Sequence, residues 1–265
     1  MRLRALQILV LVVLILFWHA MTQPGLIPPF YFEQDNRAAF FFGQPHKVFQ
    51  VVVEWFASGE IFGHLAVTLL ETALGFTIGA ASGLVIGLWL ALSPTASAVM
   101  DPYIKGLNSM PRVVLAPIFA VWFGLGIWSK VALGVTLVFF VVFFNVYQGV
   151  REVSPNVIAS ARMLGANRRQ LLRAIYVPSA MSWVFASLHN AVGLAFVGAV
   201  VGEYLGSARG VGYLILQAEG TFDINTVFAG ILVLTAFALA LDAAVGAVER
   251  RLMVWQPKAS ETEPT

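Results

Sequence analysis

The stretch IASARMLGANRRQLLRAIYVP, residues 158–178, places four arginines between two strongly apolar parts of the chain. It follows Ser154-Pro155, a pair that favours a helix start because serine is a preferred N-cap and proline is tolerated at the first helical position. Gly165 interrupts the helical pattern, and a second short helix is predicted over residues 168–175. Val177-Pro178 is expected to block that helix before the next apolar segment. The stretch therefore predicts a bent helical hairpin, apolar on one side and cationic on the other.

The composition on either side of this stretch is that of a membrane protein. Hydrophobic residues make up 59% of the 265 residues, charged residues only 11%, and the mean hydropathy is +0.82. Soluble domains contain about 45–50% apolar residues. A basic pI near 9.0 would suggest nucleic-acid binding in a soluble protein, but here lysine and arginine are expected in cytoplasmic loops. The chain has no cysteine, which excludes disulfides and thiolate metal sites.

Six segments come close to the roughly 20 apolar residues that a membrane-spanning helix needs. They cover residues 5–21, 64–92, 113–125, 128–150, 182–201 and 226–248. The first could be a signal peptide or a span, and the lack of an A-x-A cleavage pattern favours a retained span. The third is short, and we expect residues 104–111 to extend it. The sequence thus predicts an all-α membrane protein with six transmembrane helices.

Basic residues are distributed unequally between the two sides of these predicted spans. With a cytoplasmic N-terminus, twelve of the 16 lysines and arginines fall inside, and the four outside are Arg37, Lys47, Lys130 and Arg209. The positive-inside rule then places both termini and the 158–178 stretch in the cytoplasm. We predict an N-terminal helix and extracytoplasmic connector over 1–63, a core domain over 64–252 that includes the loop 151–178, and a disordered tail over 253–265.

Two explanations fit the cationic hairpin. The arginines could fix topology and meet anionic headgroups, at about 1 kcal/mol per charge. Alternatively, the short helix could insert into a groove of a cytoplasmic partner, with apolar anchors giving affinity and arginines setting the register. The bend at Gly165 favours the partner, because a helix that lies on a membrane gains nothing from being broken.

The hairpin resembles the EAA loop of ATP-binding-cassette (ABC) importer permeases, whose pattern is E-A-A-x-x-x-G-x₉-I-x-L-P. The matching residues are Ala159, Ser160, Ala161, Gly165, Ile175, Val177 and Pro178, with alanine in place of the usual glutamate at the first position. Residues 68–76, 101–126 and 202–215 extend the resemblance to the nitrate/sulfonate/taurine branch. It implies a type I importer permease of the bacterial inner membrane, a homodimer that works with two ATPase subunits and an extracytoplasmic substrate-binding protein.

The resemblance also implies which residues couple this chain to its ATPase, namely Ala159, Ser160, Ala161, Arg162, Gly165, Ala166, Arg168, Arg169 and Leu172. The chain itself has no G-x-x-x-x-G-K-[ST] phosphate-binding loop, and the glycine cluster at 206–212 lacks the lysine that such a loop needs. We therefore expect no catalytic site and no cofactor here, with ATP and magnesium on the partner subunit. Four scattered histidines, His19, His46, His64 and His189, show no metal-ligand spacing.

Polar residues within the apolar segments are candidates for the translocation pathway or a gate, because burying them in hydrocarbon is costly. These candidates are Glu71, Asn145, Gln148, Asn190 and Glu203. The amides could instead join helices by hydrogen bonds. Glycines at 75, 79, 83 and 87 recur every four residues and predict close helix packing, and glycines at 193, 198 and 202 suggest a less regular version.

The sequence thus predicts the permease subunit of an ATP-driven importer that moves a small anionic or polar organic solute by alternating access. An autonomous ion-coupled carrier or channel is the alternative. It would carry acids deep in the membrane and an internal inverted repeat, neither of which is evident.

Overall fold

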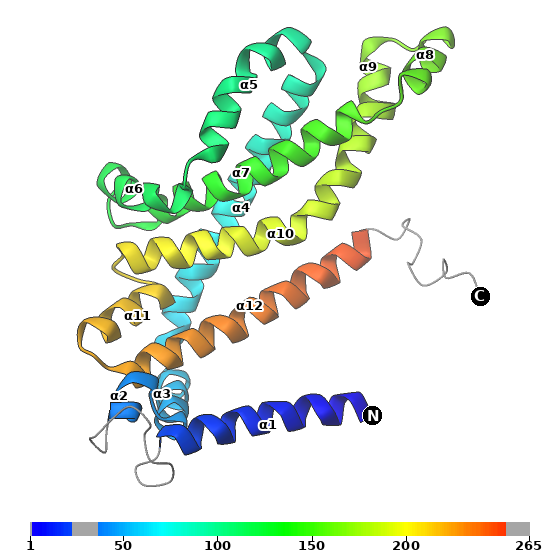
Figure 1. The fold of residues 1–265 in the computed structure, drawn as a ribbon. Coiled ribbons are helices and arrows are strands. Elements are labelled where there is room, and N and C mark those ends of the chain that lie inside the picture. Colours follow the sequence, from blue (N-terminus) through cyan, green and yellow to red (C-terminus); the bar gives the residue numbers. More distant parts are fainter. Residues whose placement is uncertain (1, 23–36, 253–265) are drawn as a thin grey trace. The chain divides into compact units, whose positions relative to one another are not determined.

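The computed structural model describes residues 2–22 and 37–252, and every element within them is helical (Figure 1). The chain divides into two compact units. The first unit consists of Met1–Thr68 and Glu203–Ala236, and the second consists of Leu69–Gly202 and Phe237–Thr265. The predicted tail and residues 23–36 of the predicted connector lie outside the described residues. The domain boundaries at residues 63 and 252 stay a prediction.

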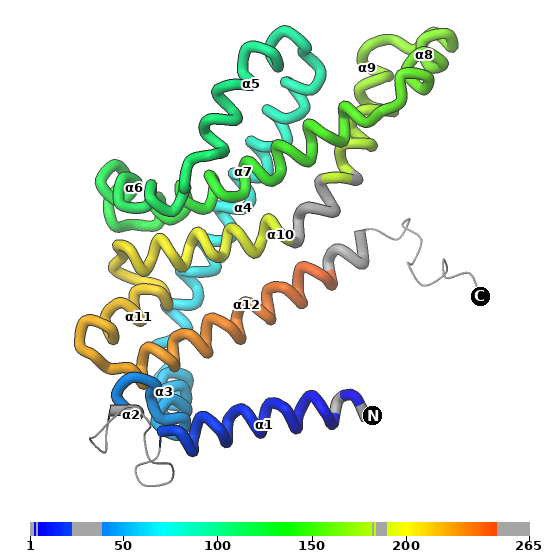
Figure 2. The backbone as a smooth tube through the Cα atoms, viewed as in Figure 1, coloured from blue at the N-terminus to red at the C-terminus, as the bar shows by residue number. Residues whose placement is uncertain are grey.

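Among the described residues, four helices are individually long and apolar enough to cross a membrane. They are α1 (Arg2–Thr22), α4 (Glu60–Leu92), α7 (Ile127–Arg151) and α12 (Ile224–Leu252). The predicted fifth span lies in α10 (Val177–Leu205), whose described apolar part is Asn190–Leu205. The all-helical membrane architecture is confirmed, and Figure 2 follows the backbone through these helices.

The predicted third span is a bent pair of helices. Helix α5 (Pro94–Ser109) is followed by the 3-10 turn η1 (Arg112–Leu115) and helix α6 (Ala116–Phe123), and the two parts meet at 84°. Residues 104–111, which we expected to extend this span, form the end of α5 and the bend that follows it, so they are not continuous with α6. Met110 adopts extended backbone angles, φ −70° and ψ 135°, because a residue before proline is disfavoured in the helical region. Counting the bent pair as one span gives up to five spans among the described helices.

The predicted glycine ridge is the surface by which α4 packs on α7 in the second unit. A Cβ atom added at Gly79 would lie 2.8 Å from Cβ of Val138. One added at Gly83 would lie 2.8 Å from the backbone oxygen of Phe139. Only glycine permits backbones to approach this closely, so the prediction of close packing is confirmed.

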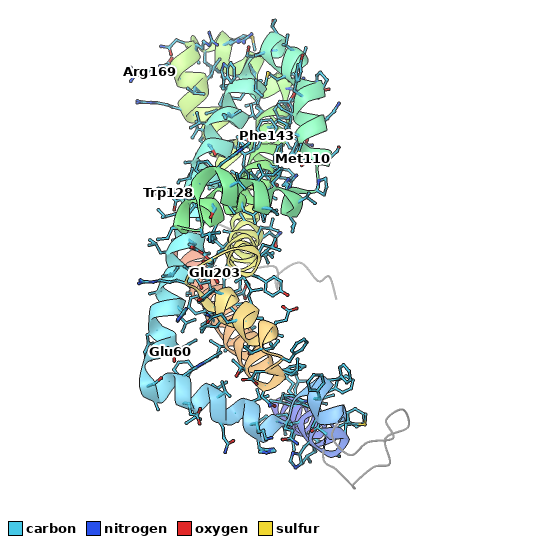
Figure 3. All side chains as sticks on the ribbon, turned by 90° about the vertical axis from the view of Figure 1, so that its left-hand side faces the viewer. Glu60, Met110, Trp128, Phe143, Arg169 and Glu203 are labelled. Atoms are coloured by element: carbon cyan, nitrogen blue, oxygen red, sulfur yellow. The ribbon has the colours of Figure 1, made fainter. Side chains whose placement is uncertain are left out.

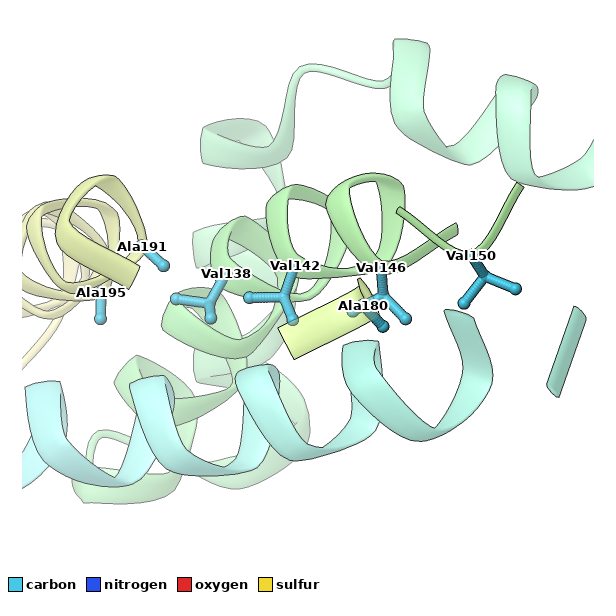
Figure 4. Packing of buried hydrophobic residues seen from close by; sticks show 7 residues of the cluster. All are labelled: Val138, Val142, Val146, Val150, Ala180, Ala191 and Ala195. Carbon is cyan, nitrogen blue, oxygen red and sulfur yellow. The ribbon is translucent and has the colours of Figure 1, made fainter. Parts of the chain in front are cut away.

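A row of valines on α7 continues this core. Val138, Val142, Val146 and Val150 recur every four residues and are buried with Ala180, Ala191 and Ala195 of α10 (Figure 4). Gly198 of α10 also packs tightly, since an added Cβ would lie 2.8 Å from Cα of Gly134. Nothing lies within 4 Å of such an atom at Gly193, so the predicted packing role is wrong at that position.

The first unit joins α1 to the short helices α2 (Arg37–Phe42) and α3 (Pro45–Ser58). The indole nitrogen of Trp18 on α1 donates a hydrogen bond to the backbone oxygen of Phe42, at 2.9 Å. The backbone N–H of Gln44 donates to Oδ1 of Asn225 at the start of α12, at 2.8 Å. Most side chains of α1 before Trp18 are exposed and apolar, as expected for a helix that faces lipid.

Candidate functional site

The arginine-rich hairpin begins with α8 (Pro155–Met163), which ends in a glycine turn. Gly165 has φ +85°, in the left-handed region that favours glycine. Its N–H donates to the Arg162 carbonyl at 2.9 Å, and the Ala166 N–H donates to the Ala161 carbonyl at 3.0 Å. These two bonds form a Schellman motif, which satisfies carbonyls that would otherwise lack partners at the helix end. The predicted bend at Gly165 is therefore confirmed.

The second helix, α9 (Arg168–Leu171), is fixed at its start by a capping box that our sequence analysis missed. The N–H of Gln170 donates to Oδ1 of Asn167 at 2.9 Å, and the N–H of Asn167 donates to Oε1 of Gln170 at 2.8 Å. The sequence carries the signal for it, because a short polar residue followed three positions later by glutamine is typical of a helix start. The hairpin thus has a defined cap on each side of its bend.

The chain stays helical beyond α9, so the prediction that Val177-Pro178 blocks continuation is wrong. A π-helical turn, η2 (Leu172–Tyr176), leads directly into α10, which begins at Val177. Proline lacks an N–H and crowds the carbonyl four residues earlier. A wider π turn is a known way to relieve such a conflict within a helix. The hairpin is therefore joined to α10 without a flexible break.

The surface of the hairpin is both cationic and apolar. Arg162, Arg168, Arg169 and Arg173 are exposed, and none of them forms an ion pair with a described residue. Met163 and Leu164, at the apex, are 81% and 89% exposed. This combination of free charge and exposed apolar side chains is typical of a docking surface.

A pocket of about 760 Å³ lies beside these arginines, and we call it the loop pocket. Its lining includes Arg162, Arg168, Arg169 and Ala166, together with Leu92, Leu171, Leu172 and Tyr176. Figure 3 shows Arg169 on this segment. Leu171 is buried beneath the surface and anchors α9 to the second unit.

The structure brings the predicted coupling residues together as one surface element. Ala159, Ser160, Ala161 and Arg162 lie on α8, Gly165 and Ala166 form the turn, Arg168 and Arg169 lie on α9, and Leu172 opens the π turn. Five of them, Arg162, Ala166, Arg168, Arg169 and Leu172, line the loop pocket. Their role in coupling stays a prediction.

The predicted pathway residues do not converge in the same way. Asn145 donates from Nδ2 to the Val141 carbonyl at 2.8 Å, within α7. Gln148 donates from Nε2 to Oε1 of Glu152, the residue that follows α7, at 3.0 Å. Asn190 is exposed, while Glu71 is buried in α4 at 2% exposure. These four residues stay candidates for a pathway or gate.

Glu203, the fifth pathway candidate, is fully buried in the first unit and holds a loop in place. Its Oε1 accepts a hydrogen bond from the Thr68 hydroxyl at 2.6 Å, and its Oε2 accepts one from the Gly212 N–H at 2.8 Å. The same hydroxyl of Thr68 accepts a bond from the Val211 N–H at 3.2 Å. The carboxylate therefore joins α4, the end of α10 and α11 (Val211–Gly220).

Lys130 is a buried polar residue that sequence reasoning missed. We had counted it among extracytoplasmic loop residues, but it lies in the first turn of α7 with 1% of its surface exposed. Its Nζ donates to the backbone oxygens of Leu125 at 2.7 Å and Gly126 at 3.1 Å. A lysine inside a predicted apolar span was the available signal, since such residues need partners.

The capped, cationic hairpin lies between the long helices α7 and α10, where the resemblance to ABC importer permeases led us to expect it. Residues 83–254 match the family model described as binding-protein-dependent transport system inner membrane component. The match covers more than half of the chain, so the chain belongs to this family.

Two relatives and one solved structure agree with this assignment. The chain is 34% identical to the putative aliphatic sulfonates transport permease protein SsuC of Bacillus subtilis, over 77% of this chain and 74% of the relative. It is 33% identical to the formylaminopyrimidine transport permease protein ThiX of Halalkalibacterium halodurans, over 82% and 88%. A chain of an amino acid ABC transporter crystal structure matches with a TM-score of 0.61 at 20% identity, covering 76% of this chain and 97% of that one. This chain is a permease subunit of an ABC importer, and it is an inner membrane component that is not itself catalytic.

Proposed function

We propose that the hairpin α8–α9 seats this permease in a groove of its ATPase partner and that ATP-driven motion enters the membrane helices there. The observation that carries the proposal is a rigid, unpartnered cationic surface with an exposed apolar apex at Met163 and Leu164. Headgroup binding alone would explain the arginines, but it would not explain a turn capped on both sides of its bend.

The connections of the hairpin support transmission of force. It follows α7, which ends at Arg151, and it continues into α10 through the π turn. Both helices contribute to the valine and alanine core of the second unit. Because packed cores shift between discrete arrangements rather than deform gradually, a displacement of the hairpin would move α7 and α10 together.

The remaining parts of the proposal rest on the resemblance to ABC importer permeases. ATP, magnesium and hydrolysis belong to the partner subunit, and a second copy of this chain completes the pore in a homodimer. An extracytoplasmic binding protein delivers the solute, and the two permeases alternate between inward-facing and outward-facing states. Both chain termini then lie in the cytoplasm, consistent with the bias in basic residues.

The solute class is a small anionic or polar organic molecule. The two named relatives are described as permeases for aliphatic sulfonates and for formylaminopyrimidine, so the family accepts compact polar solutes. The alternative of an autonomous carrier gains no support from the family match.

The decisive experiment is co-purification of the ATPase with tagged wild-type chain and with two charge reversals. Arg169→Glu should weaken recovery of the ATPase at least tenfold, because Arg169 lines the loop pocket. Lys105→Glu is the control, since Lys105 is exposed on α5, outside the hairpin, and does not line that pocket. ATP-dependent uptake should fall in parallel with recovery.

Wild-type recovery and uptake with Arg169→Glu would sink the proposed seat. Equal losses for both variants would show that general surface charge, rather than the loop pocket, attracts the ATPase. Purification of a single-chain oligomer without any ATPase would favour the autonomous carrier.

A further inference from the structure

Helix α3, in the first unit, leaves part of its apolar surface uncovered. Val48 and Trp55 are 0% and 8% exposed, so one side of the helix packs against the rest of the unit. Phe49, Val53 and Phe56 are 57%, 62% and 45% exposed, and we call these three residues the apolar sector of α3. Exposed patches of large apolar side chains mark contacts with lipid or with another protein.

The polar residues of α3 are gathered on a different side of the helix. Lys47, Gln50 and Glu54 are exposed, and we call them the polar sector. Because an α-helix turns by about 100° per residue, the three members of each sector share one face, and the polar face follows the apolar face around the helix. The helix therefore has a packed side, an apolar side and a polar side. This division is typical of a helix that lies beside protein at the boundary between lipid and water.

The start of α3 lies at the end of α1, which is long and apolar enough to cross the membrane. The rings of His19 on α1 and His46 on α3 meet edge to face, with centroids 6.2 Å apart. Figure 1 looks nearly along α3 and Figure 3 looks nearly along α1, so α3 crosses the end of α1 rather than running beside it. A helix that crosses the end of a membrane-spanning helix lies in the plane of the membrane surface.

The other end of α3 is joined to a second helix of spanning length. The chain turns at Gly59, where φ is +79°, and α4 begins at Glu60, as Figure 3 shows. Phe62 in the first turn of α4 is 57% exposed, and its ring packs edge to face on that of Phe56, with centroids 5.6 Å apart. The apolar sector of α3 is therefore continuous with exposed apolar surface on a helix that is long enough to span the membrane.

The charges of α3 indicate what kind of surface it contacts. In the polar sector, the positive charge of Lys47 is offset by the negative charge of Glu54. The sector thus offers no net charge to attract anionic headgroups or a charged protein partner, and binding to a membrane would come from burial of apolar area.

We propose that α3 is an interfacial helix. Its apolar sector is embedded at the boundary between the headgroups and acyl chains of the membrane that α1 crosses, and its polar sector faces water. The helix anchors the end of α1 and the start of α4 at the membrane surface. This inference is independent of the proposed coupling role of the hairpin.

The test uses nitroxide spin labels on the full-length chain in phosphatidylcholine nanodiscs. The chain has no cysteine, so each introduced cysteine is the only labelling site. Three variants probe the apolar sector and three matched controls probe the polar sector of the same helix: Phe49→Cys, Val53→Cys and Phe56→Cys, then Lys47→Cys, Gln50→Cys and Glu54→Cys. All six side chains are exposed, so Tm should stay at the wild-type value in every variant.

The measurement is the collision rate of each label with oxygen, which concentrates in lipid, and with nickel ethylenediaminediacetate, which stays in water. The ratio of the oxygen rate to the nickel rate should be several-fold higher at each apolar position than at each polar position. Equal ratios at all six positions would overturn the proposal. So would high nickel rates at the apolar positions, which a docking face for a soluble partner would give. Low rates with both reagents and spin–spin broadening there would show that a second copy covers the sector instead.

Discussion

Replacing Gly165 tests whether the geometry of the hairpin turn, and not merely its charge, is needed for coupling. Proline holds φ near −65°, whereas Gly165 has φ +85°. Proline also lacks the N–H that donates to the Arg162 carbonyl at 2.9 Å. Gly165→Pro therefore cannot form the observed turn and should abolish ATPase recovery and ATP-dependent uptake.

Less disruptive substitutions at Gly165 should cause smaller losses of ATPase recovery and uptake than Gly165→Pro. No atom lies within 4 Å of a Cβ added at Gly165, so Gly165→Ala introduces backbone strain without a clash. Left-handed backbone costs an L-residue about 1–2 kcal/mol. About 1 kcal/mol lowers the population of the native turn roughly fivefold relative to alternatives. Gly165→Asn should cost less, because asparagine is found at such helix ends.

The assay is ATPase co-purification with uptake, supported by amide hydrogen exchange at Gly165 and Ala166, whose N–H groups close the turn. Gly59→Ala is the matched control, because Gly59 has a similar φ of +79° and only the edge of the Phe62 ring at 4.0 Å. It should leave ATPase recovery unchanged. Recovery that is normal with Gly165→Pro, or equal losses with Gly59→Ala, would refute the reasoning.

Four further substitutions test the packing that supports these sites. Asn167→Ala removes one half of the capping box and should destabilise α9 by about 1 kcal/mol, measured as faster amide exchange at Gln170. Gly83→Ala forces a Cβ to 2.8 Å from a backbone oxygen and should cost about 1–3 kcal/mol, seen as a lower Tm in detergent. Gly193→Ala, where nothing lies within 4 Å, should leave Tm unchanged or raise it, and a fall would contradict the packing argument. Glu203→Gln replaces one carboxylate oxygen with an NH2 group, which accepts no hydrogen bond, so one of the two buried donors loses its acceptor. The change should cost about 1–3 kcal/mol in a thermal melt, and an unchanged Tm would show that the carboxylate does not hold the loop.

Sequence reasoning succeeded where a single residue, or the regular spacing of residues along one helix, is enough to determine the local structure. Gly165 was predicted to end a helix, and its positive φ follows from local backbone preference. The four-residue spacing of the glycines in α4 predicted a smooth face, because helical geometry puts such positions on one side. The same periodicity could not identify α7 as the helix that packs on this glycine face, because the packing partner depends on how the whole chain folds.

The candidate site was predicted unevenly. All nine coupling residues lie on the hairpin, because they are close in sequence and a short segment carries them together. The pathway candidates are spread over α4, α7 and α10, so their arrangement depends on how long helices pack. Polarity alone could not show that Asn145 and Gln148 form bonds one helical turn away, or that Glu203 holds a loop.

By itself, the sequence determined that the chain is a helical membrane protein, where its apolar segments lie, and where the cationic hairpin bends. Those properties follow from composition, helical periodicity and the local preferences of glycine and proline. Only the tertiary structure decided the 84° break in the third span, the π turn that carries the helix past Pro178, and the burial of Lys130 and Glu203. Pro111 and Pro178 favour a break or a wider turn locally, but local preference specifies neither the angle of the break nor that the helix continues past Pro178. The burial of Lys130 and Glu203 depends on contacts with residues distant in sequence.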